Sequence, residues 1–500
     1  MRRTMLVVAL ILMVVVAGAW PAWSASDRVA LWAQPVSEVS VQQVDFNGDG
    51  FTDLAVGVPG EVVGGAAVGA VNIVYGAAGG LTGANQLLTQ ASPEDGDSFG
   101  SAVAKGDFNH DGFTDLAVGA PDEGLAASKA GAVNVFYGSA GGLAATSQVL
   151  TQANPQEEEL FGETLESGLF NDDAYLDLAV GAPWDGVGTG AVNVFYGSAA
   201  GLPASSQVLR QANPGPEEHF GFSLAAGWFN GGQQDLAVGT PENYDPRWRS
   251  AGAVNVFYGT PSGLSGSSQA LLQGNPETGD RFGSALAAGR FDGDQWYDLA
   301  VGAPYENVGE INNPGAVNIF YGSATNGLAA TARQTFIQGV RAGGSAEPGD
   351  HFGAALAAGP FDSGAGWELA VGGPDEDVAA KANAGAVNVL YGSSTGLVGR
   401  GQVLTQGSPG VVGAAEAGDR FGARFAQGIL SNDFNGDGRA DLAIAVPGEQ
   451  LGAIAGAGAV NVQYGSANGL PGAGGQLLTQ DSPGMADNAE QGDGFGGGLD

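Results

Sequence analysis

GAVNVFY, at residues 131–137, is a short apolar run whose recurrence decides the fold. Its first four letters occur seven times, starting at 69, 131, 190, 252, 315, 385 and 458. A second apolar run such as DLAVGAP precedes each copy, a run such as QVLTQ follows it, and the pair FG then opens the next unit. Because these motifs return together every 59 to 73 residues, the chain has a repeat architecture.

Each unit is predicted to contain four β-strands, because its apolar runs are five to eight residues long and end at Gly, Pro, Asn or Asp. Val133 and Val135 fall on one face of the third strand and Phe136 on the other. A sheet that is apolar on both faces must pack between two neighbours. We therefore predict an all-β fold, a seven-bladed β-propeller of four-stranded antiparallel blades, with a linear solenoid as the alternative. In the second unit the strands are expected near 99–107, 115–120, 131–137 and 147–152.

The ends of the repeat region bear on how the ring closes. RVALWAQP at 28–35 resembles the strand QVLTQANP, so it is expected to complete the last blade. FGGGLD at 495–500 looks like the first strand of an eighth unit. Either the chain is a piece of a longer one, which we favour, or this stub packs on the ring. The propeller is assigned to residues 28–500.

The N-terminus and the charge indicate export. Residues 1–25 have a basic start and an apolar run that is shorter than the roughly 20 residues of a membrane span. They are read as a signal peptide, with a membrane anchor as the alternative. The mature chain, without a membrane span, is expected to be secreted or at the cell surface. A net charge of −36 argues against nucleic acid as a partner, and the absence of Cys excludes disulfides.

Three acidic loops join the first and second strands of their units: DFNGDGFTDL at 45–54, DFNHDGFTDL at 107–116 and DFNGDGRADL at 433–442. Side-chain oxygens stand at positions 1, 3, 5 and 9, position 7 offers a carbonyl, and Gly at position 6 permits a sharp turn. This is the ligand spacing of the first part of an EF-hand loop, and hard oxygen ligands suit calcium. The predicted calcium ligands are Asp45, Asn47, Asp49, Phe51 and Asp53; Asp107, Asn109, Asp111, Phe113 and Asp115; and Asp433, Asn435, Asp437, Arg439 and Asp441.

The other four loops are incomplete, and no metal is predicted there. Units three and five have Leu169 and Arg290 at position 1, although Asp292, Asp294 and Asp298 remain in unit five. The loop WFNGGQQDL of unit four is one residue short, and PFDSGAGWEL of unit six keeps only Asp362 and Glu368.

Together, FG, LAVGAP, GAVNVFYG and the D-x-N-x-D-G-x-x-D loop resemble the FG-GAP repeat, over roughly residues 37–500. That repeat builds the N-terminal propeller of integrin α chains and recurs in many bacterial exported proteins. The resemblance implies calcium in the loops named above and a role in adhesion or recognition. The chain departs from integrins in which units carry the loops, and no von Willebrand-type insertion interrupts its repeats.

Catalysis is not expected. Of the three histidines, His110 lies inside a calcium loop, while His219 and His351 directly precede FG. No HExxH motif or paired-histidine zinc spacing occurs. The many carboxylate pairs leave a glycosidase-like or lyase site open as an alternative.

A protein or glycan ligand is expected on the face opposite the calcium loops. The connections from the fourth strand to the next FG lengthen in the last three units, and long loops on a rigid scaffold often carry recognition. On the same face ENYDPRWRSAG offers Tyr244, Arg247, Trp248 and Arg249 as candidate contacts. The leading hypothesis is an exported calcium-binding propeller for adhesion or protein recognition. The alternatives are a lectin-like carbohydrate binder and a structural repeat region of a larger surface protein.

Overall fold

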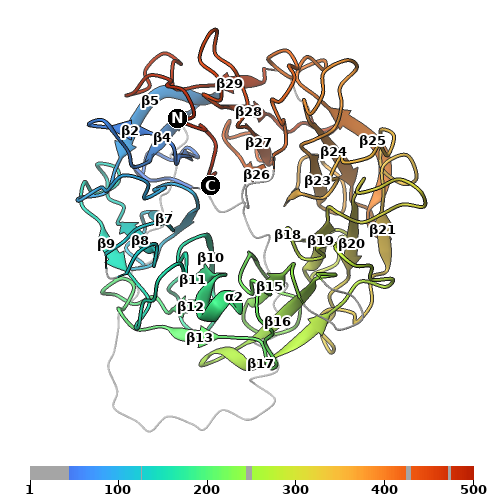
Figure 1. Cartoon of the computed structure of the whole chain (residues 1–500), viewed down its shortest axis with the longest axis horizontal. Helices are drawn as coiled ribbons and strands as arrows, with labels where there is room; N and C mark the ends of the chain where they lie inside the picture. Colours follow the sequence, from blue (N-terminus) through green and yellow to red (C-terminus); the bar gives the residue numbers. More distant parts are fainter. Residues whose placement is uncertain (1–43, 126, 244–249, 424–428, 471–473, 500) are drawn as a thin grey trace, which may run out of the picture. The chain divides into compact units, whose positions relative to one another are not determined.

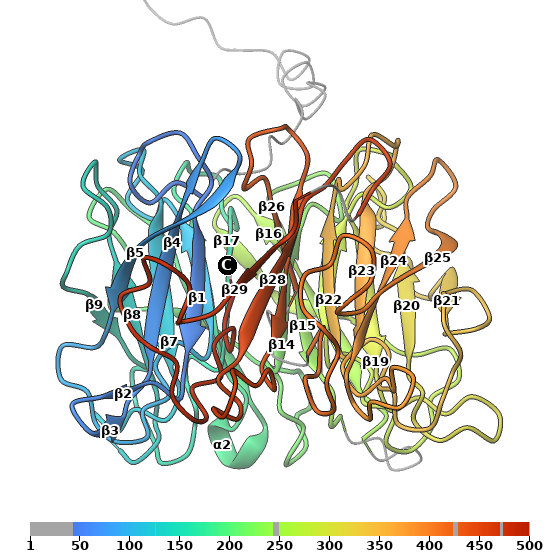
Figure 2. The same cartoon turned by 90° about the horizontal axis from the view of Figure 1, so that it is seen from above.

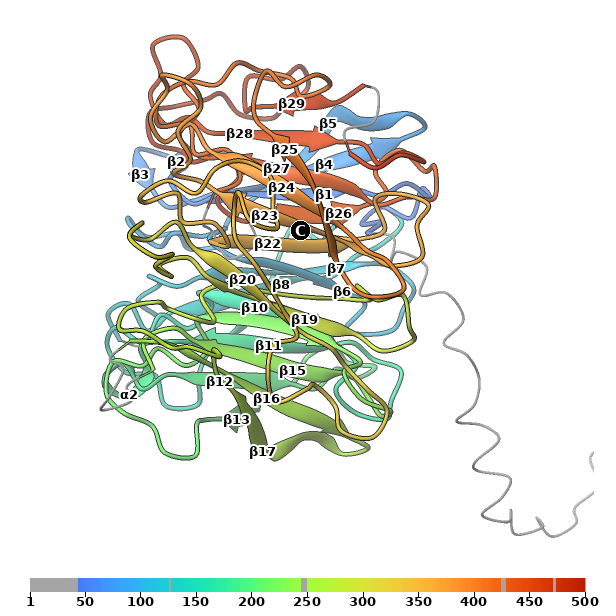
Figure 3. The ribbon, with the colours of Figure 1, turned by 90° about the vertical axis from the view of Figure 1, so that its right-hand side faces the viewer.

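Seven antiparallel sheets form a closed ring (Figure 1). The structure, a computed structural model, describes residues 44–499 except 126, 244–249, 424–428 and 471–473. The sheets stack face to face around the ring when the propeller is viewed from its side (Figure 3). The predicted seven-bladed propeller is thereby confirmed, and the solenoid is excluded. The predicted signal peptide at 1–25 and the strand at 28–35 lie outside the described residues.

Strands follow one another in chain order within each blade. Blade one contains β1 (Leu54–Val58), β4 (Ala70–Ala77) and β5 (Gly80–Leu88), and blade two contains β6 (Val103–Gly106), β7 (Asp115–Ala120), β8 (Ala132–Phe136) and β9 (Gln148–Leu150). Blade three contains β10 (Thr164–Gly168), β11 (Asp177–Ala182), β12 (Ala191–Phe195) and β13 (Gln207–Leu209). Blade four contains β14 (Ser223–Gly227), β15 (Asp235–Thr240), β16 (Ala253–Thr260) and β17 (Gly263–Leu271). Blade five contains β18 (Leu286–Gly289), β19 (Asp298–Ala303), β20 (Ala316–Phe320) and β21 (Gln334–Phe336). Blade six contains β22 (Ala355–Gly359), β23 (Glu368–Gly373), β24 (Ala386–Tyr391) and β25 (Val398–Leu404). Blade seven is β26 (Ile429–Asn432), β27 (Asp441–Val446), β28 (Ala459–Gln463) and β29 (Gln476–Leu478).

The four strands of a blade are called A to D from first to last, and their connections divide between two faces of the ring. The A–B loops lie on one face, and the B–C and D–A connections lie on the other. Two B–C connections contain short elements, the hairpin β2 (Val62–Val63) and β3 (Ala66–Ala67) and the single turn α2 (Asp185–Gly188). Figure 2 shows these elements on the same face.

Blade one takes its strand A from the end of the described chain. Leu499 forms an antiparallel bridge with Val56, and the Gly57 N–H donates to the Gly498 carbonyl at 2.7 Å. The same register relates strand A to strand B in blade two. Residues 495–499 therefore pack on the ring, in the place that strand A holds in the other blades.

The apolar core is divided into seven clusters, and each lies between two neighbouring blades. Val133 and Val135 of β8 pack toward blade three, where they meet Leu178. Phe136 of the same strand packs toward blade one. Strands β7 and β8 are buried along their whole length, so the two-faced burial expected from the sequence is confirmed.

The recurrence of FG and GAVN reflects a close backbone approach between blades. Gly252, which opens the GAVN of blade four, forms a parallel bridge with Phe282 of the next FG. Its φ is 87°, and a Cβ at this position would lie 2.1 Å from the Phe282 carbonyl oxygen. Only glycine fits this approach. The equivalent glycines at the other junctions are Gly69, Gly131, Gly190, Gly315, Gly385 and Gly458.

A tyrosine and a glutamine join the outer parts of neighbouring blades. The Tyr137 hydroxyl donates to Gln148 Oε1 at 2.6 Å, and Gln148 Nε2 donates to the Leu202 carbonyl of blade three at 2.7 Å. The arrangement recurs around the ring. At the junction that closes the ring, Gln476 Nε2 donates to the Leu81 carbonyl at 3.0 Å.

One buried carboxylate per blade, called here the clamp carboxylate, stands where strand B begins, which is loop position 9 in every blade except blade four, whose loop is one residue shorter. In blade four Asp235 accepts the Phe229 N–H at 3.0 Å and the Gly259 N–H at 2.9 Å, which ties the A–B loop to the end of strand C. Burial raises the pKa of Asp53, Asp115, Asp177 and Asp235 to about 7, and that of Asp298, Glu368 and Asp441 to about 8.

The close approach between blades predicts a large cost for Gly252→Ala. A positive φ costs a non-glycine residue about 1–2 kcal/mol, and the clash adds about 1–3 kcal/mol. Gly309→Ala is the matched control, because Gly309 has a φ of 63° and open space around its Cβ position. Urea unfolding should show a clearly larger loss in the free energy of unfolding for Gly252→Ala than for Gly309→Ala. Equal losses would mean that the Gly–Phe approach does not constrain the ring.

The clamp carboxylates predict that the calcium-free protein loses stability as the pH rises. Their folded-state pKa values lie above the ordinary values near 4, so the folded state binds more protons than the unfolded state between about pH 4 and pH 8. The stabilisation is fully present below about pH 4 and is lost as the pH rises through 7 to 8. Melting temperatures in calcium-free buffer should therefore fall between about pH 5 and pH 8. A flat or rising profile would contradict this assignment.

Candidate functional site

The first carboxylate of each complete loop organises the loop tip. Asp45 Oδ1 accepts the N–H groups of Gly48 and Asp49 at 2.6 and 3.1 Å, and its Oδ2 accepts the Gly50 N–H at 2.8 Å. Asp107 and Asp433 accept the equivalent N–H groups of positions 5 and 6 in their own loops. A carboxylate surrounded by backbone donors turns the chain around itself, so position 1 is held near the centre of the loop.

Positions 3 and 5 form successive side-chain-to-backbone turns on the exposed side of the loop. Asn47 Oδ1 accepts the Asp49 N–H at 2.9 Å, and Asp49 Oδ1 accepts the Phe51 N–H at 3.0 Å. The same contacts occur at Asn109 and Asp111 and at Asn435 and Asp437. The predicted ligands at positions 1, 3 and 5 are thus brought together in all three loops.

Position 9 has a second role that the sequence analysis did not identify. Asp53 Oδ2 accepts the Phe46 N–H at 2.9 Å and its Oδ1 accepts the Gly76 N–H at 2.9 Å. It is the clamp carboxylate of blade one, and the nearby charges of Asp45 and Asp49 add to the rise of its pKa. The signal was available, because an acidic residue opens strand B in all seven units, including those with incomplete loops.

The donor set of the complete loops fits a calcium ion. It consists only of carboxylate, amide and carbonyl oxygens, and each clamp oxygen keeps a lone pair beyond the N–H that it accepts. In the described loops the oxygens of positions 1, 5 and 9 do not all lie within 4.8 Å of one another. Binding therefore requires these side chains to come closer together. In the third loop the Arg439 side chain lies 3.8 Å from Asp437 Oδ2 and competes weakly with an ion there.

The incomplete loops keep the fold of the complete ones without the first carboxylate. In blade three Asn171 and Asp173 make the same side-chain-to-backbone contacts. In blade five Arg290 stands at position 1, and its Nε donates to the Asp294 carbonyl at 2.7 Å. The clamp carboxylates Asp177 and Asp298 keep their backbone partners. The fold of the loop is thus independent of the first carboxylate.

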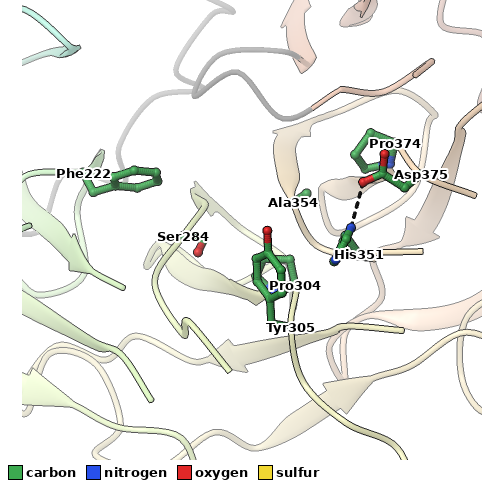
Figure 4. A pocket seen from close by; sticks show the side chains of 8 residues that line it. All are labelled: Phe222, Ser284, Pro304, Tyr305, His351, Ala354, Pro374 and Asp375. Carbon is green, nitrogen blue, oxygen red and sulfur yellow. Dashed lines mark hydrogen bonds and ion pairs between the residues drawn. The ribbon is translucent and has the colours of Figure 1, made fainter. Parts of the chain in front are cut away.

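The opposite face carries a run of charged and aromatic side chains around a cavity. The Tyr305 ring packs against the His351 ring with centroids 4.5 Å apart, and His351 Nδ1 lies 2.7 Å from Asp375 Oδ2 (Figure 4). Arg420 contacts the same carboxylate at 3.3 Å, and the Arg281 guanidinium lies 4.8 Å from the Tyr305 ring centroid. An adjoining cavity of about 450 Å³ is lined by Phe222, Ser284, Asp375 and Arg420 among others.

His219 occupies a similar place two blades away from His351. Its ring packs against the Trp184 ring with centroids 4.2 Å apart, and burial lowers the pKa of His219. Trp184 itself is 46% exposed. These aromatic and basic residues alternate between B–C and D–A connections, which the sequence analysis did not relate to one another. The predicted contacts Tyr244, Arg247, Trp248 and Arg249 lie outside the described residues.

Ser98 lies in a sequence that fits the G-x-S-x-G pattern of many hydrolases, GDSFG at 96–100. It has a φ of 57°, and its hydroxyl donates to Asp122 at 2.8 Å. The residue before FG has a positive φ in the other six units as well, so this backbone geometry belongs to the repeat. None of the hydrogen bonds in the described chain joins Ser98 to a histidine. The contact therefore gives no support to a catalytic triad.

Known proteins match the repeats of this chain. The family model "FG-GAP repeat" matches residues 39–83, 99–136, 282–320 and 426–462. Integrin alpha-PS5 of Drosophila melanogaster is 39% identical over 152 residues, which are 29% of this chain and 14% of the relative. Human integrin alpha-6 is 32% identical over 164 residues, which are 32% of this chain and 14% of the relative.

A second class of relative is named as an enzyme. Human phosphatidylinositol-glycan-specific phospholipase D is 30% identical over 329 residues, which are 59% of this chain and 38% of the relative. The chain thus spans well under half the length of these curated relatives. Among solved structures, the V. cholerae biofilm matrix protein Bap1 aligns over 89% of this chain and 82% of its own, with 10% identity and a TM-score of 0.26, which is too low to support an argument.

Within the described ranges, no helix has the length and apolar character needed to cross a membrane. The sheets, the motifs and the matched segments agree on the repeat. The chain carries FG-GAP repeats, and its seven-bladed β-propeller is related to integrin α chains and to phosphatidylinositol-glycan-specific phospholipase D.

Proposed function

We propose that this chain is an exported, calcium-binding β-propeller that recognises a protein ligand in adhesion, at the cell surface or after secretion. The observation that carries the proposal is the set of three complete A–B loops, in which positions 1, 3 and 5 gather oxygen donors. The relationship to integrin α chains supports the recognition role. Because the chain covers only a small share of those relatives, any activity of theirs is a proposal for this chain.

Calcium would act as a local staple. Each loop brings three carboxylates close together, and their mutual repulsion falls when a divalent ion lies between them. The free energy of ion binding then contributes to folding, in a chain that has no cysteine. Asp45, Asn47, Asp49, the Phe51 carbonyl and Asp53 would hold the ion in blade one, and the equivalent residues would do so in blades two and seven.

The ligand surface would be the face opposite these loops. Its cavity of about 450 Å³ is rimmed by Arg420 and Asp375, and its surroundings combine aromatic rings with both signs of charge. Such mixed surfaces suit protein ligands, because Arg and aromatic residues supply many binding hot spots. Catalysis is not part of the proposal, although one class of relative is named as an enzyme.

A lectin-like function is the second candidate, and one observation favours it. Trp184 is exposed on the ligand face and packs against His219. An exposed indole beside polar groups is a common platform for a sugar ring. Protein recognition remains the leading proposal because charged contacts continue across several blades around the cavity.

The calcium proposal predicts that Asp49→Asn removes one binding site. Asn keeps the oxygen that accepts the Phe51 N–H, so the loop should still fold. Calcium at about 100 times its Kd stabilises a protein by about 2.7 kcal/mol per site, and the variant should lose about that much of the calcium-dependent gain. Thermal unfolding of the wild type and the variant, in calcium and in a chelator, measures this gain.

Asp173→Asn is the matched control, because Asp173 makes the same contacts in a loop that has Leu169 at position 1. It should keep the full calcium response. The calcium proposal would be overturned by a wild-type melting temperature that does not respond to chelation.

The two ligand classes predict opposite responses on the proposed face. If the ligand is a protein, Arg420→Glu should lower binding on an array of purified surface and matrix proteins at least about tenfold, while Trp184→Ala changes it little. If the ligand is a glycan, Trp184→Ala should lower binding on a glycan array at least about tenfold, while Arg420→Glu changes it little. Asp172→Lys on the A–B face is the control for a charge change and should leave both unchanged. A loss with Asp172→Lys alone would place the ligand on the calcium face instead.

A further inference from the structure

A second group of carboxylates lies on the face opposite the A–B loops, at the junction of blades one and two. Glu94 and Asp97 belong to the D–A connection that enters blade two, and Glu123 belongs to the B–C connection of blade two. It is the one group of three in the described chain whose carboxylate oxygens all lie within 4.8 Å of one another. Ligands at 2.3–2.6 Å from a calcium ion are at most about 5 Å apart, so the group has the size of one coordination sphere.

The three side chains are buried to different degrees and are not neutralised by the protein. Asp97 and Glu123 are each 2% exposed, whereas Glu94 is exposed. No ion pair among the described residues involves any of the three. A carboxylate oxygen of Asp97 and one of Glu123 lie within 4.8 Å of each other. Two buried carboxylates this close require either a shared proton or a cation.

A buried amide supplies an independent sign of a missing ligand. Gln90, at the end of blade one, is 8% exposed, and its Nε2 donates to Glu123 Oε2 at 2.6 Å. Its Oε1, on the same amide group, has no hydrogen-bond partner. Buried oxygen acceptors are nearly always satisfied in proteins. A cation between the carboxylates and this amide would use all four groups.

The same four-residue set recurs at four further junctions. In each, the glutamine donates to the acidic residue of the B–C connection and its Oε1 lacks a partner. At two of them the buried Asp280 and Asp493 also have one carboxylate oxygen without a partner. The sets are Gln273, Glu277, Asp280 and Glu306; Gln338, Glu347, Asp350 and Glu376; Gln406, Glu416, Asp419 and Glu449; and Gln480, Glu490, Asp493 and Glu61.

The junction of blades two and three shows what the protein does when the first carboxylate is absent. Gln156 stands where Glu94 stands in the preceding junction. Here Arg210 reaches Asp185 with both terminal nitrogens, at 2.6 and 3.0 Å. A positive charge of the chain itself thus occupies the place beside the B–C acid. This substitution indicates that the other junctions accept a cation from solution.

We propose that Gln90, Glu94, Asp97 and Glu123 form a divalent-cation site of the calcium type at the junction of blades one and two. The ion joins a D–A connection to a B–C connection. It therefore links the strands that surround the opening of the ring on the proposed ligand face. This inference is independent of the A–B loops, because the two sets of residues lie on opposite faces.

The test counts bound calcium by mass spectrometry of the purified protein after dialysis. Glu94→Gln reproduces the natural Gln156, so the variant should fold, and it should lose about one ion per chain. Glu123→Gln should do the same. Glu157→Gln is the matched control, because Glu157 is an exposed glutamate in the equivalent connection of the Arg210 junction. It should keep the wild-type number of ions, and circular dichroism verifies folding for all variants.

The outcomes separate this site from the A–B loops. Asp49→Asn probes an A–B loop. If this variant loses bound calcium while Glu94→Gln and Glu123→Gln do not, the junction site is overturned and the loop site is supported. Losses in the junction variants alone support the junction site and overturn the loop site. If the wild type retains no calcium, both fall, and the carboxyl groups of Asp97 and Glu123 then share a proton.

Discussion

Burial on both faces of every blade is the constraint on which the rest of this structure depends. A sheet such as β6 to β9 contributes its two apolar faces to two different clusters, so no blade has a core of its own. Stability arises only when neighbours are present on both sides, which means that the ring must close. Closure brings residues 495–499 against β1 and places Phe495 and Leu499 in the cluster between blades seven and one.

The same stacking creates an electrostatic problem, because it gathers acidic residues where the blades meet. The chain has 53 acidic residues and 17 lysines and arginines, and many of the acids lie at loop ends or junctions. Each clamp carboxylate reduces its desolvation cost by accepting two or three backbone N–H groups. The junction carboxylates have fewer such donors, and one of these junctions contains Arg210. Cations from solution are the simplest way to satisfy the others.

The fold was predictable from the sequence because the same motifs recur in seven units. The four strands per unit, the two-faced burial of β8 and the positions of the A–B loops all followed from local spacing. The proximity of Asp97 and Glu123 did not, because the two residues are 26 positions apart and meet only after the blades stack. The double role of Asp53 was missed for a similar reason, since its second partner is Gly76 at the end of another strand.

The distribution of complete loops follows the weak point of the ring. Blade one is the only blade in the described chain whose strand A position is filled by residues 495–499, from the other end of the sequence. Residues 479–494 connect blade seven to this strand, whereas strands A and B of blade one are joined by backbone hydrogen bonds such as that from the Gly57 N–H to the Gly498 carbonyl. The three complete loops belong to blades seven, one and two, and these blades flank the closure. The clamp carboxylate keeps each loop folded whether or not an ion is bound, so blades three to six can lose ligands without losing structure. The complete loops are therefore found where an additional local constraint would do most to keep the ring closed.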